Sequence, residues 1–352
     1  MAEGIPSDSA CLAQGGHESV KYKLLVLLCC PNCRSDLLLV DAKCVGEEVE
    51  SGDLRCTGCG RYYPIVGYVP RFVPTENYAG SFGFQWNRFR RTQLDSFSGL
   101  PISRDRFFRQ TGWSPMDIAG KSVLDLGCGA GRFSEVALSC GATVVAVDYS
   151  SAVDACWQNL RSHLNFHVIQ ADIYTLPLRP GKFEFVYCLG VLQHTPDVKR
   201  AVMDAAAQIF PQGRIVVDVY PRNIRSALHP KTWLRPITTR IDPVRLFSLV
   251  ERATPSLLSF SRRCDRVPVM GRYIRRLVPV ANYEGVYPLS ENQLLEWATL
   301  DTYDMLSPRY DQPQTPERLY AWLTEAGLED VEVIEAGLLT GRGRKPALRA
   351  FD

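Results

Sequence analysis

The sequence predicts an α/β protein: a doubly wound sheet of seven strands, with a small cysteine-rich module before it and a helical insertion within it. Three observations carry this prediction. Apolar strand-like runs alternate with helical stretches through residues 121–220. Two Cys-x-x-Cys pairs precede that region, and a proline- and arginine-rich stretch, residues 221–290, follows it. Alternating strands and helices are typical of a parallel sheet covered by helices on both faces.

Length and charge set the outer limits of this architecture. A chain of 352 residues is long enough for one large α/β domain and a smaller module. The net charge of +2 is unevenly distributed: residues 221–280 hold 13 Lys and Arg against 3 Asp and Glu, which leaves −8 for the remainder. We find no secretory signal, because the apolar run Leu24–Cys30 is short and lacks a small-residue cleavage site. We therefore expect a cytoplasmic protein with reduced thiols.

The cysteine-rich module is predicted over residues 21–74, after a small, polar segment 1–20 that we expect to be disordered. Its two knuckles are Cys30–Cys33 and Cys56–Cys59, separated by 22 residues. Two such pairs supply four thiolates for a tetrahedral, structural zinc ion. Cys29 is adjacent to Cys30 and remains an alternative ligand. We expect short strands around the metal at Leu24–Leu28, Leu37–Val40 and Tyr62–Val69.

A glycine turn lies at the centre of the predicted sheet. The alternating run Val123–Leu126 leads into Gly127-Cys128-Gly129-Ala130-Gly131, and a helix is expected to follow. A strand, a glycine turn and a helix place free backbone N–H groups where ligand oxygens approach closely. The next strand ends at Asp148, 17 residues after Gly131, close to the spacing of a carboxylate that binds ribose hydroxyls.

These features fit either a dinucleotide enzyme or a methyltransferase, and Asp125 helps to separate the two. A carboxylate just before the first glycine would repel a pyrophosphate. It would instead favour the ammonium and sulfonium groups of S-adenosylmethionine. The stretch Val123–Phe133 resembles the first motif of class I S-adenosylmethionine-dependent methyltransferases of the type 11-like group. The run Cys59–Ile65 resembles zinc-ribbon modules that are fused to, or partnered with, such enzymes.

The resemblance implies a Rossmann-like sheet, an S-adenosylmethionine cofactor and a set of site residues. It assigns Asp148 to the ribose hydroxyls, Asp172 to the adenine amino group and Ile173 to the adenine face. Asp125 and Gly127 would face the methionine portion. A helix N-cap is the alternative role for Asp148 and for Asp172. The complete set of expected cofactor contacts is Asp125, Gly127, Cys128, Gly129, Gly131, Asp148, Tyr149, Asp172, Ile173 and Leu189.

The remaining elements are predicted in chain order. The core, 121–220, has strands at Lys121–Leu126, Thr143–Asp148, Phe166–Gln170, Phe183–Leu189 and Arg214–Tyr220. A helix spans Asp197–Phe210, with Thr195 as its N-cap. Residues 221–290 form a basic helical lid. Residues 291–352 complete the core with a helix at Thr315–Ala326, a strand at Val331–Ala336 and an antiparallel edge strand at Lys345–Phe351.

The connector, residues 75–120, is rich in aromatic residues and arginine. The resemblance implies that it packs over the cofactor pocket, where Gln85 or Arg106 is placed to meet the methionine carboxylate. The alternative is a helix that packs its aromatic face against the core.

The acceptor side is predicted from two stretches. The loop Cys188–Thr195 lacks the Asn/Asp-Pro-Pro-Tyr sequence of DNA adenine methyltransferases and resembles small-molecule methyltransferases. His194 is its candidate general base for a hydroxyl acceptor, or else it orders the loop. The stretch Leu300–Asp311 is the second candidate, either as a pocket wall or as a packed surface loop. Its polar and aromatic candidates are Tyr303, Asp304 and Tyr310.

Two functional hypotheses follow from these residues. The first is methylation of a small-molecule or lipid- or glycan-linked hydroxyl acceptor. The second is methylation of RNA, as in ribosomal RNA guanine methyltransferases with a zinc module, although here the basic residues lie in the insertion instead. The pairs Arg262–Arg263 and Arg275–Arg276 lie beside apolar clusters. This pattern favours an anionic acceptor or peripheral contact with an anionic membrane. A non-catalytic zinc adaptor is disfavoured because the cofactor motifs are intact.

Overall fold

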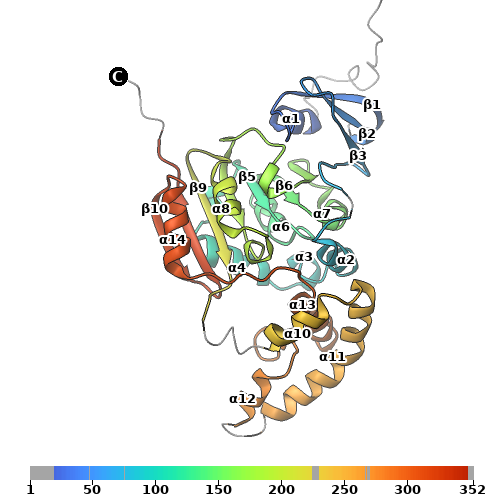
Figure 1. Ribbon diagram of the computed structural model, residues 1–352, viewed down its shortest axis with the longest axis vertical. Coiled ribbons are helices and arrows are strands. Elements are labelled where there is room, and N and C mark those ends of the chain that lie inside the picture. Colours follow the sequence, from blue (N-terminus) through green and yellow to red (C-terminus); the bar gives the residue numbers. More distant parts are fainter. Residues whose placement is uncertain are drawn as a thin grey trace, which may run out of the picture.

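The computed structural model describes residues 20–347 apart from 47, 75, 224–229, 266, 268 and 269 (Figure 1). The prediction for residues 1–20 therefore lies outside the described residues, except at Val20. Figure 1 shows the large sheet at the centre of the molecule. The cysteine-rich module and the lid lie toward opposite ends of its long axis.

The large sheet has seven strands in the order β10-β11-β9-β8-β5-β6-β7. The five strands from β9 to β7 pair in parallel, and β11 pairs antiparallel with both of its neighbours. This confirms the predicted doubly wound, seven-stranded sheet. The strands are β5 (Ser122–Leu126), β6 (Thr143–Asp148), β7 (Phe166–Gln170), β8 (Phe183–Cys188), β9 (Ile209–Val219), β10 (Glu329–Glu335) and β11 (Leu339–Arg344).

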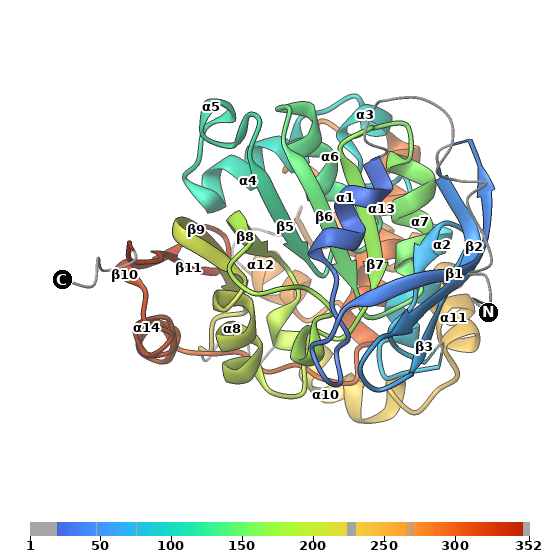
Figure 2. The same cartoon turned by 90° about the horizontal axis from the view of Figure 1, so that it is seen from above.

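Helices cover both faces of this sheet, because alternate residues of each strand point to opposite sides. Leu124 and Leu126 of β5 share one buried cluster with α8 (Val198–Ala206) and α14 (Pro316–Glu325). Val123 shares the other cluster, which contains residues of α4 (Ile102–Thr111), α6 (Arg132–Ser139) and α7 (Ala152–Leu160). Figure 2 shows α4 and α6 on one side of the sheet and α8 on the other.

The cysteine-rich module is an antiparallel four-stranded sheet preceded by a helix. We predicted a strand at Leu24–Leu28, and this prediction was wrong, because Leu24 belongs to a helix. Leu24 and Leu28 are one helical turn apart and both are buried in the cluster shared with β5, an arrangement that a helix provides. The elements are α1 (Val20–Leu27), β1 (Leu37–Val45), β2 (Glu48–Cys56), β3 (Tyr62–Val66) and β4 (Val69–Pro70).

The module is bonded to the segment that follows β7. The guanidinium of Arg34 donates to the carbonyl oxygens of Leu176 (2.8 Å) and Leu178 (2.6 Å). Leu28 forms an isolated antiparallel bridge with Leu178, and the Cys29 N–H donates to Pro177 O at 2.9 Å. The metal-binding end of the module is thus fixed to the loop that continues from Asp172 and Ile173.

The connector and the lid consist of helices. The connector contains α2 (Gly80–Arg88), α3 (Asp95–Ser98), α4 and α5 (Pro115–Ile118), and the lid contains α10 (Pro230–Thr238), α11 (Pro243–Asp265) and α12 (Met270–Arg276). Helix α13 (Glu291–Leu306), which we assigned to the core range 291–352, has its main contacts with α10, α11 and α2. It therefore packs with the lid rather than against a strand of the large sheet. The domain boundaries themselves remain predictions.

Two further element predictions are corrected. The N-cap of α8 is Asp197, whose side chain accepts from Arg200 N at 3.0 Å, and not Thr195. The predicted edge strand Lys345–Phe351 is replaced by β11, which ends at Arg344 and lies inside the sheet; residues 348–351 lie outside the described residues. The alternating glycines of β11 concealed this strand. They leave space for α14, since a Cβ on Gly341 would lie 2.6 Å from Leu323 Cδ1.

Across the part of the chain that the structure describes, no helix is both long enough and apolar enough to span a bilayer.

Candidate active site

A cavity of about 760 Å³ lies beyond the carboxyl ends of the parallel strands. This is the edge of an open α/β sheet where ligands bind. The loops after β5, β6, β7 and β8 supply one wall, and the connector and the lid supply the others. Nine of the predicted site residues line it: Gly127, Cys128, Gly129, Asp148, Tyr149, Ile173, Leu189, His194 and Asp304.

The glycine turn contributes backbone to the cavity wall. Gly127 and Gly129 line the cavity with φ angles of 82° and 53°. A Cβ on Gly127 would lie 2.3 Å from Val191 Cγ2, so only glycine fits beside the loop after β8. Gly131 is not among the described residues that line the cavity. Its missing side chain makes room for α7, because a Cβ there would lie 2.6 Å from Leu160 Cδ1.

Asp148 is held at the cavity wall with its carboxylate fixed in orientation. Oδ2 accepts from Gly129 N at 2.9 Å, and Oδ1 accepts from Ser150 N at 2.8 Å and from Ser150 Oγ at 2.7 Å. Burial raises the pKa of Asp148, and these hydrogen bonds oppose that rise. The result is a positioned acceptor suited to the hydroxyl groups of a ribose.

Two of the predicted cofactor contacts, Asp125 and Asp172, have other partners in the structure. Asp125 is buried, and its Oδ2 accepts from Ser134 Oγ (2.6 Å) and Tyr187 OH (2.9 Å). Burial raises the pKa of Asp125 to about 7. Asp172 caps the short 3-10 turn Ile173–Thr175 by accepting from Tyr174 N at 2.9 Å. Neither is among the described residues lining the cavity. Asp125 connects β5 to α6 and β8, and Asp172 holds the turn after β7.

The connector closes the cofactor half of the cavity. Tyr78 stacks on Tyr149 with ring centroids 4.8 Å apart, and both line the cavity. Arg106, one of the two candidates for the methionine carboxylate, also lines it and pairs with Asp218 at 3.3 Å. Gln85, the other candidate, donates to Asp304 Oδ1 at 3.1 Å and is outside the described lining.

His194 lies at the acceptor half of the cavity. Its Nδ1 lies 2.9 Å from Tyr310 O. Because a carbonyl oxygen only accepts, Nδ1 carries the proton, and the neutral ring keeps its lone pair on Nε2. Burial lowers the pKa of His194, with the nearby carboxylate of Asp304 opposing the decrease. The imidazole is therefore neutral at physiological pH.

Of the other residues predicted for the acceptor side, one lines the cavity and one is buried in the lid. Asp304 lines the cavity, and Tyr303 is not among the described residues that line it. Tyr303 is fully buried in the lid, where its hydroxyl donates to Pro243 O at 3.3 Å and its ring packs against Phe247. Neighbouring helical residues point about 100° apart, so these two residues of α13 face different surroundings. Tyr310 contributes its backbone oxygen to His194.

Several lining residues were missed from the sequence. On α13 and the segment before it, the cavity is lined by Tyr283, Tyr287, Trp297 and Asp301. Tyr283 donates to Asp301, whose pKa is raised to about 6 by burial. From α10 come Lys231 and Arg235. The high local charge of the insertion was the available signal for these two cations, but it did not distinguish them from the arginines on the surface.

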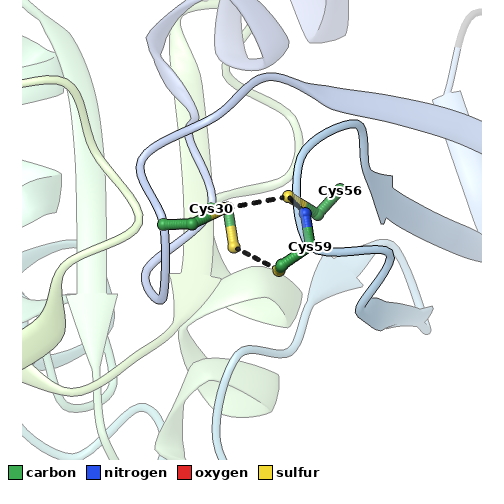
Figure 3. Close-up of side chains that lie close together, drawn as sticks. Cys30, Cys56 and Cys59 are labelled. Atoms are coloured by element: carbon green, nitrogen blue, oxygen red, sulfur yellow. Dashed lines mark hydrogen bonds between the residues drawn. The ribbon is translucent and has the colours of Figure 1, made fainter.

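The four predicted metal ligands come together in the small module. Their sulfur atoms all lie within 4.8 Å of one another, with Cys30 and Cys59 at 3.7 Å and Cys33 and Cys56 at 3.3 Å. Figure 3 shows Cys30, Cys56 and Cys59 turned toward one another from two loops. Tetrahedral zinc with bonds of about 2.3 Å separates its sulfur ligands by about 3.8 Å. The cluster fits a closed, structural zinc site, and Cys29 is not a member of it.

Comparison with known families agrees with this geometry. Residues 124–217 match the family described as "Methyltransferase domain", and residues 21–67 match "Trm112p-like protein". The chain carries a class I methyltransferase domain. The first match begins inside β5 and ends in β9, so it covers the cofactor half of the cavity wall.

Individual relatives of the methyltransferase domain were also found. The chain is 31% identical over 147 residues to a ubiquinone biosynthesis O-methyltransferase of Coxiella burnetii, covering 41% of this chain and 59% of the relative. It is 33% identical over 118 residues to the protein of that name from Thiobacillus denitrificans, covering 32% and 49%. The chain thus spans less than two thirds of the length of either relative. A solved structure, a putative S-adenosyl-L-methionine-dependent methyltransferase from Methanococcus maripaludis, overlaps with a TM-score of 0.43 at 13% identity, covering 79% of this chain and 99% of that one.

The cavity of the methyltransferase domain fits S-adenosylmethionine, the cofactor of this class. Asp148 presents fixed carboxylate oxygens, Ala171 and Ile173 form an apolar wall beside it, and Arg106 supplies a cation. These groups match a ribose, an adenine face and a carboxylate in turn.

Proposed function

We propose that the protein transfers the methyl group of S-adenosylmethionine to a hydroxyl oxygen of a small-molecule or lipid- or glycan-linked acceptor. The observation that carries this proposal is the buried, neutral His194, which lines the cavity with Nδ1 bonded to Tyr310 O. The names of the relatives support oxygen as the acceptor atom, since they are O-methyltransferases.

The residues of the cavity have two tasks, to position the acceptor hydroxyl and to remove its proton. The bound cofactor supplies an electrophilic methyl group on a sulfonium. In-line attack of the acceptor oxygen on this carbon would form the O–CH3 bond, break the S–CH3 bond and release the sulfur as S-adenosylhomocysteine. His194 accepts the hydroxyl proton on Nε2. Holding the oxygen in line accounts for most of the acceleration, and proton removal by a positioned base adds to it.

Asp304 supports the protonated form of this base. Its charge raises the proton affinity of His194, while burial lowers it. Gln85 holds the Asp304 carboxylate in place at 3.1 Å. When His194 takes up a proton, the nearby carboxylate stabilises the imidazolium.

The test is methyl transfer from methyl-labelled S-adenosylmethionine to a panel of phenolic and lipid-linked hydroxyl acceptors. Replacing His194→Gln should lower the turnover rate by about 10²- to 10⁴-fold, the range of a general base. The matched control is His163→Gln, because His163 is exposed on the surface. Equal rates for the two variants would remove His194 from the reaction.

The pH profile provides a second measurement. The base must be neutral, and the pKa of His194 lies below its ordinary value of about 6.5. The rate should therefore stay constant above neutrality and fall only as the pH drops below that ordinary value. A decline that begins well above pH 7 would contradict the assignment.

A further inference from the structure

Two cations of the lid enter the acceptor half of the cavity. Lys231 and Arg235 are one helical turn apart on α10, and both line the cavity. Their side chains are only 15% and 10% exposed. Both pair with the same oxygen, Asp311 Oδ2, at 3.0 Å and 2.7 Å. Two largely buried cations thus share one carboxylate.

These cations lie close to the proposed base. Asp311 directly follows Tyr310, whose backbone oxygen holds His194, so one short segment connects the base and the cations. The ring of Tyr220 contacts both sides of this arrangement. Lys231 Nζ lies 4.1 Å from its centroid, and the His194 ring packs perpendicular to it with the ring centroids 5.6 Å apart. The base and one of the two cations therefore contact the same aromatic ring.

The segment that holds them is firmly attached to the sheet. Gln312 N donates to Gln193 O at 2.8 Å, and its side chain donates to Thr195 O at 2.8 Å. Gln314 N donates to Tyr220 O at 2.9 Å. The spacing between base and cations is consequently set by the backbone of the core.

Arg235 keeps donors available after its described contacts are made. Nε donates to Met305 O at 2.8 Å. Nη1 lies 2.7 Å from Asp311 Oδ2 but is buried without a hydrogen-bond partner among the described residues. Asp304 also lines this part of the cavity, but its described hydrogen bond is to Gln85 and not to either cation. The Asp304 carboxylate does act electrostatically on Lys231. The buried Nη1 of Arg235 still lacks a hydrogen-bond acceptor among the described residues, and an oxygen of an anionic ligand would supply one.

We propose that Lys231 and Arg235 bind an anionic group of the acceptor, a carboxylate or a phosphate, in the same half of the cavity as the hydroxyl that His194 deprotonates. This inference rests on the proposed function and names the substrate class of the same site. Arginine suits such a group because its planar fork offers paired donors, and lysine adds a point charge.

The proposal places the anionic contact at residues other than those indicated by the sequence. Arg262 pairs with Glu284 and Glu291 on the surface, each at 2.9 Å. Arg275 and Arg276 are not among the described residues lining the cavity. Among the basic residues of 221–280 that the structure describes, Lys231 and Arg235 line the cavity.

The experiment measures probe binding by calorimetry with and without S-adenosylhomocysteine. The probes are 3,4-dihydroxybenzoate, its uncharged methyl ester and 3,4-dihydroxyphenyl phosphate. They are aromatic because the rings of Phe82 and Tyr220 flank His194. We expect the unmodified protein to bind at least one anionic probe about tenfold more tightly than the ester, the scale of a hydrogen bond to a charged group. Comparison of the two anions shows which group the site prefers.

Variants test the two cations. Lys231→Gln should remove most of this preference, whereas Arg240→Gln, an exposed lid variant, should retain it. Arg235→Lys keeps the charge at the buried position and should weaken whichever anionic probe the unmodified protein prefers, because the fork is lost.

Different results would overturn the anionic subsite and the proposed function. Equal binding of the anionic probes and the ester, or a preference that survives Lys231→Gln, would overturn the anionic subsite. Absence of S-adenosylhomocysteine binding would overturn the proposed function, whatever the probes do.

Discussion

Asp148 is the single residue on which we expect cofactor binding to depend most. Replacing Asp148→Ala removes the fixed acceptor for the ribose hydroxyls. The affinity for S-adenosylmethionine should fall by about 1.5–3 kcal/mol, the scale of lost hydrogen bonds to a charged group. Calorimetric titration of the cofactor measures this change.

A control for this variant concerns the turn itself, because Asp148 also accepts from Gly129 N and Ser150. Ser150→Ala removes one hydrogen bond to the carboxylate but leaves the carboxylate present. It should retain most of the affinity. An Asp148→Ala protein that is folded, by its melting temperature, and binds the cofactor normally would exclude Asp148 from the site.

At the residue scale, the sequence predicts residues whose position follows from the path of the backbone. It does not predict the direction in which a helical side chain points. Gly127 and Asp148 follow from a strand, a turn and a fixed spacing, and the structure places both at the cavity. Tyr303 and Asp304 are neighbours on α13, and only the packing of that helix against α2 and α11 decides which one reaches the cavity. Sequence alone contains no information on that rotation.

At the scale of elements, substitution of two glycines distinguishes the cost of a positive φ from the cost of a steric clash with a neighbouring helix. Gly131→Ala forces a residue with φ of 90° to carry a Cβ that would lie 2.6 Å from Leu160 Cδ1. Gly141→Ala imposes a similar φ, 84°, in open space. We expect Gly131→Ala to destabilise the fold by about 2–4 kcal/mol, and Gly141→Ala by about 1 kcal/mol, in urea unfolding. Equal losses would show that α7 moves away without cost.

The zinc module offers the second test at this scale. We expect one zinc ion per chain, held by Cys30, Cys33, Cys56 and Cys59, in protein purified under reducing, chelator-free conditions. Structural zinc contributes to folding, so chelation should unfold residues of about 25–70 while the large sheet survives. Hydrogen exchange would locate the change, and metal analysis would give the stoichiometry.

The contacts of Arg34 extend this prediction. The carbonyls of Leu176 and Leu178 lose their partner when the module unfolds, and the same loop begins at Asp172 and Ile173. Exchange should therefore rise at residues 173–179 as well. Unchanged exchange there after complete zinc removal would mean that the loop holds its shape independently.

The sequence predicts the bounds of elements that have a clear apolar pattern. It does not predict elements whose form depends on packing against other parts of the fold. β6 and β7 have the predicted bounds because both are rich in apolar residues, Val144–Val147 in β6 and Phe166, Val168 and Ile169 in β7. Helix α1 and strand β11 were missed for a different reason. One is a short apolar run that reads equally as strand or helix, and the other contains two glycines that only α14 and its surroundings explain.

At the scale of the whole molecule, the outer surface of the lid combines apolar and basic side chains. Tyr273, Ile274 and Leu277 are exposed beside Arg275 and Arg276 at the end of α12. We expect native protein to bind anionic liposomes, and Arg275→Gln with Arg276→Gln to weaken that binding several-fold. Cofactor affinity should be unchanged, because neither arginine is among the described residues lining the cavity. Liposome co-sedimentation at two salt concentrations measures the effect.

The same preparation addresses the RNA hypothesis. Binding to RNA that falls steeply with added salt would support it, since phosphate contacts release counterions. If native protein binds neither anionic liposomes nor RNA, this surface has no role in binding them and only covers the site.

The insertion begins and ends at one point of the sheet. Pro221 and Gln314 form a parallel bridge, and Arg222 N donates to Gln314 O at 2.7 Å. The chain therefore leaves the core and returns to it at the same place, so the sheet places little restriction on how long the intervening segment is. Evolution can exchange the residues between these two points as a block. A new acceptor preference can then arise in one step, while the strands that bind the cofactor keep their register.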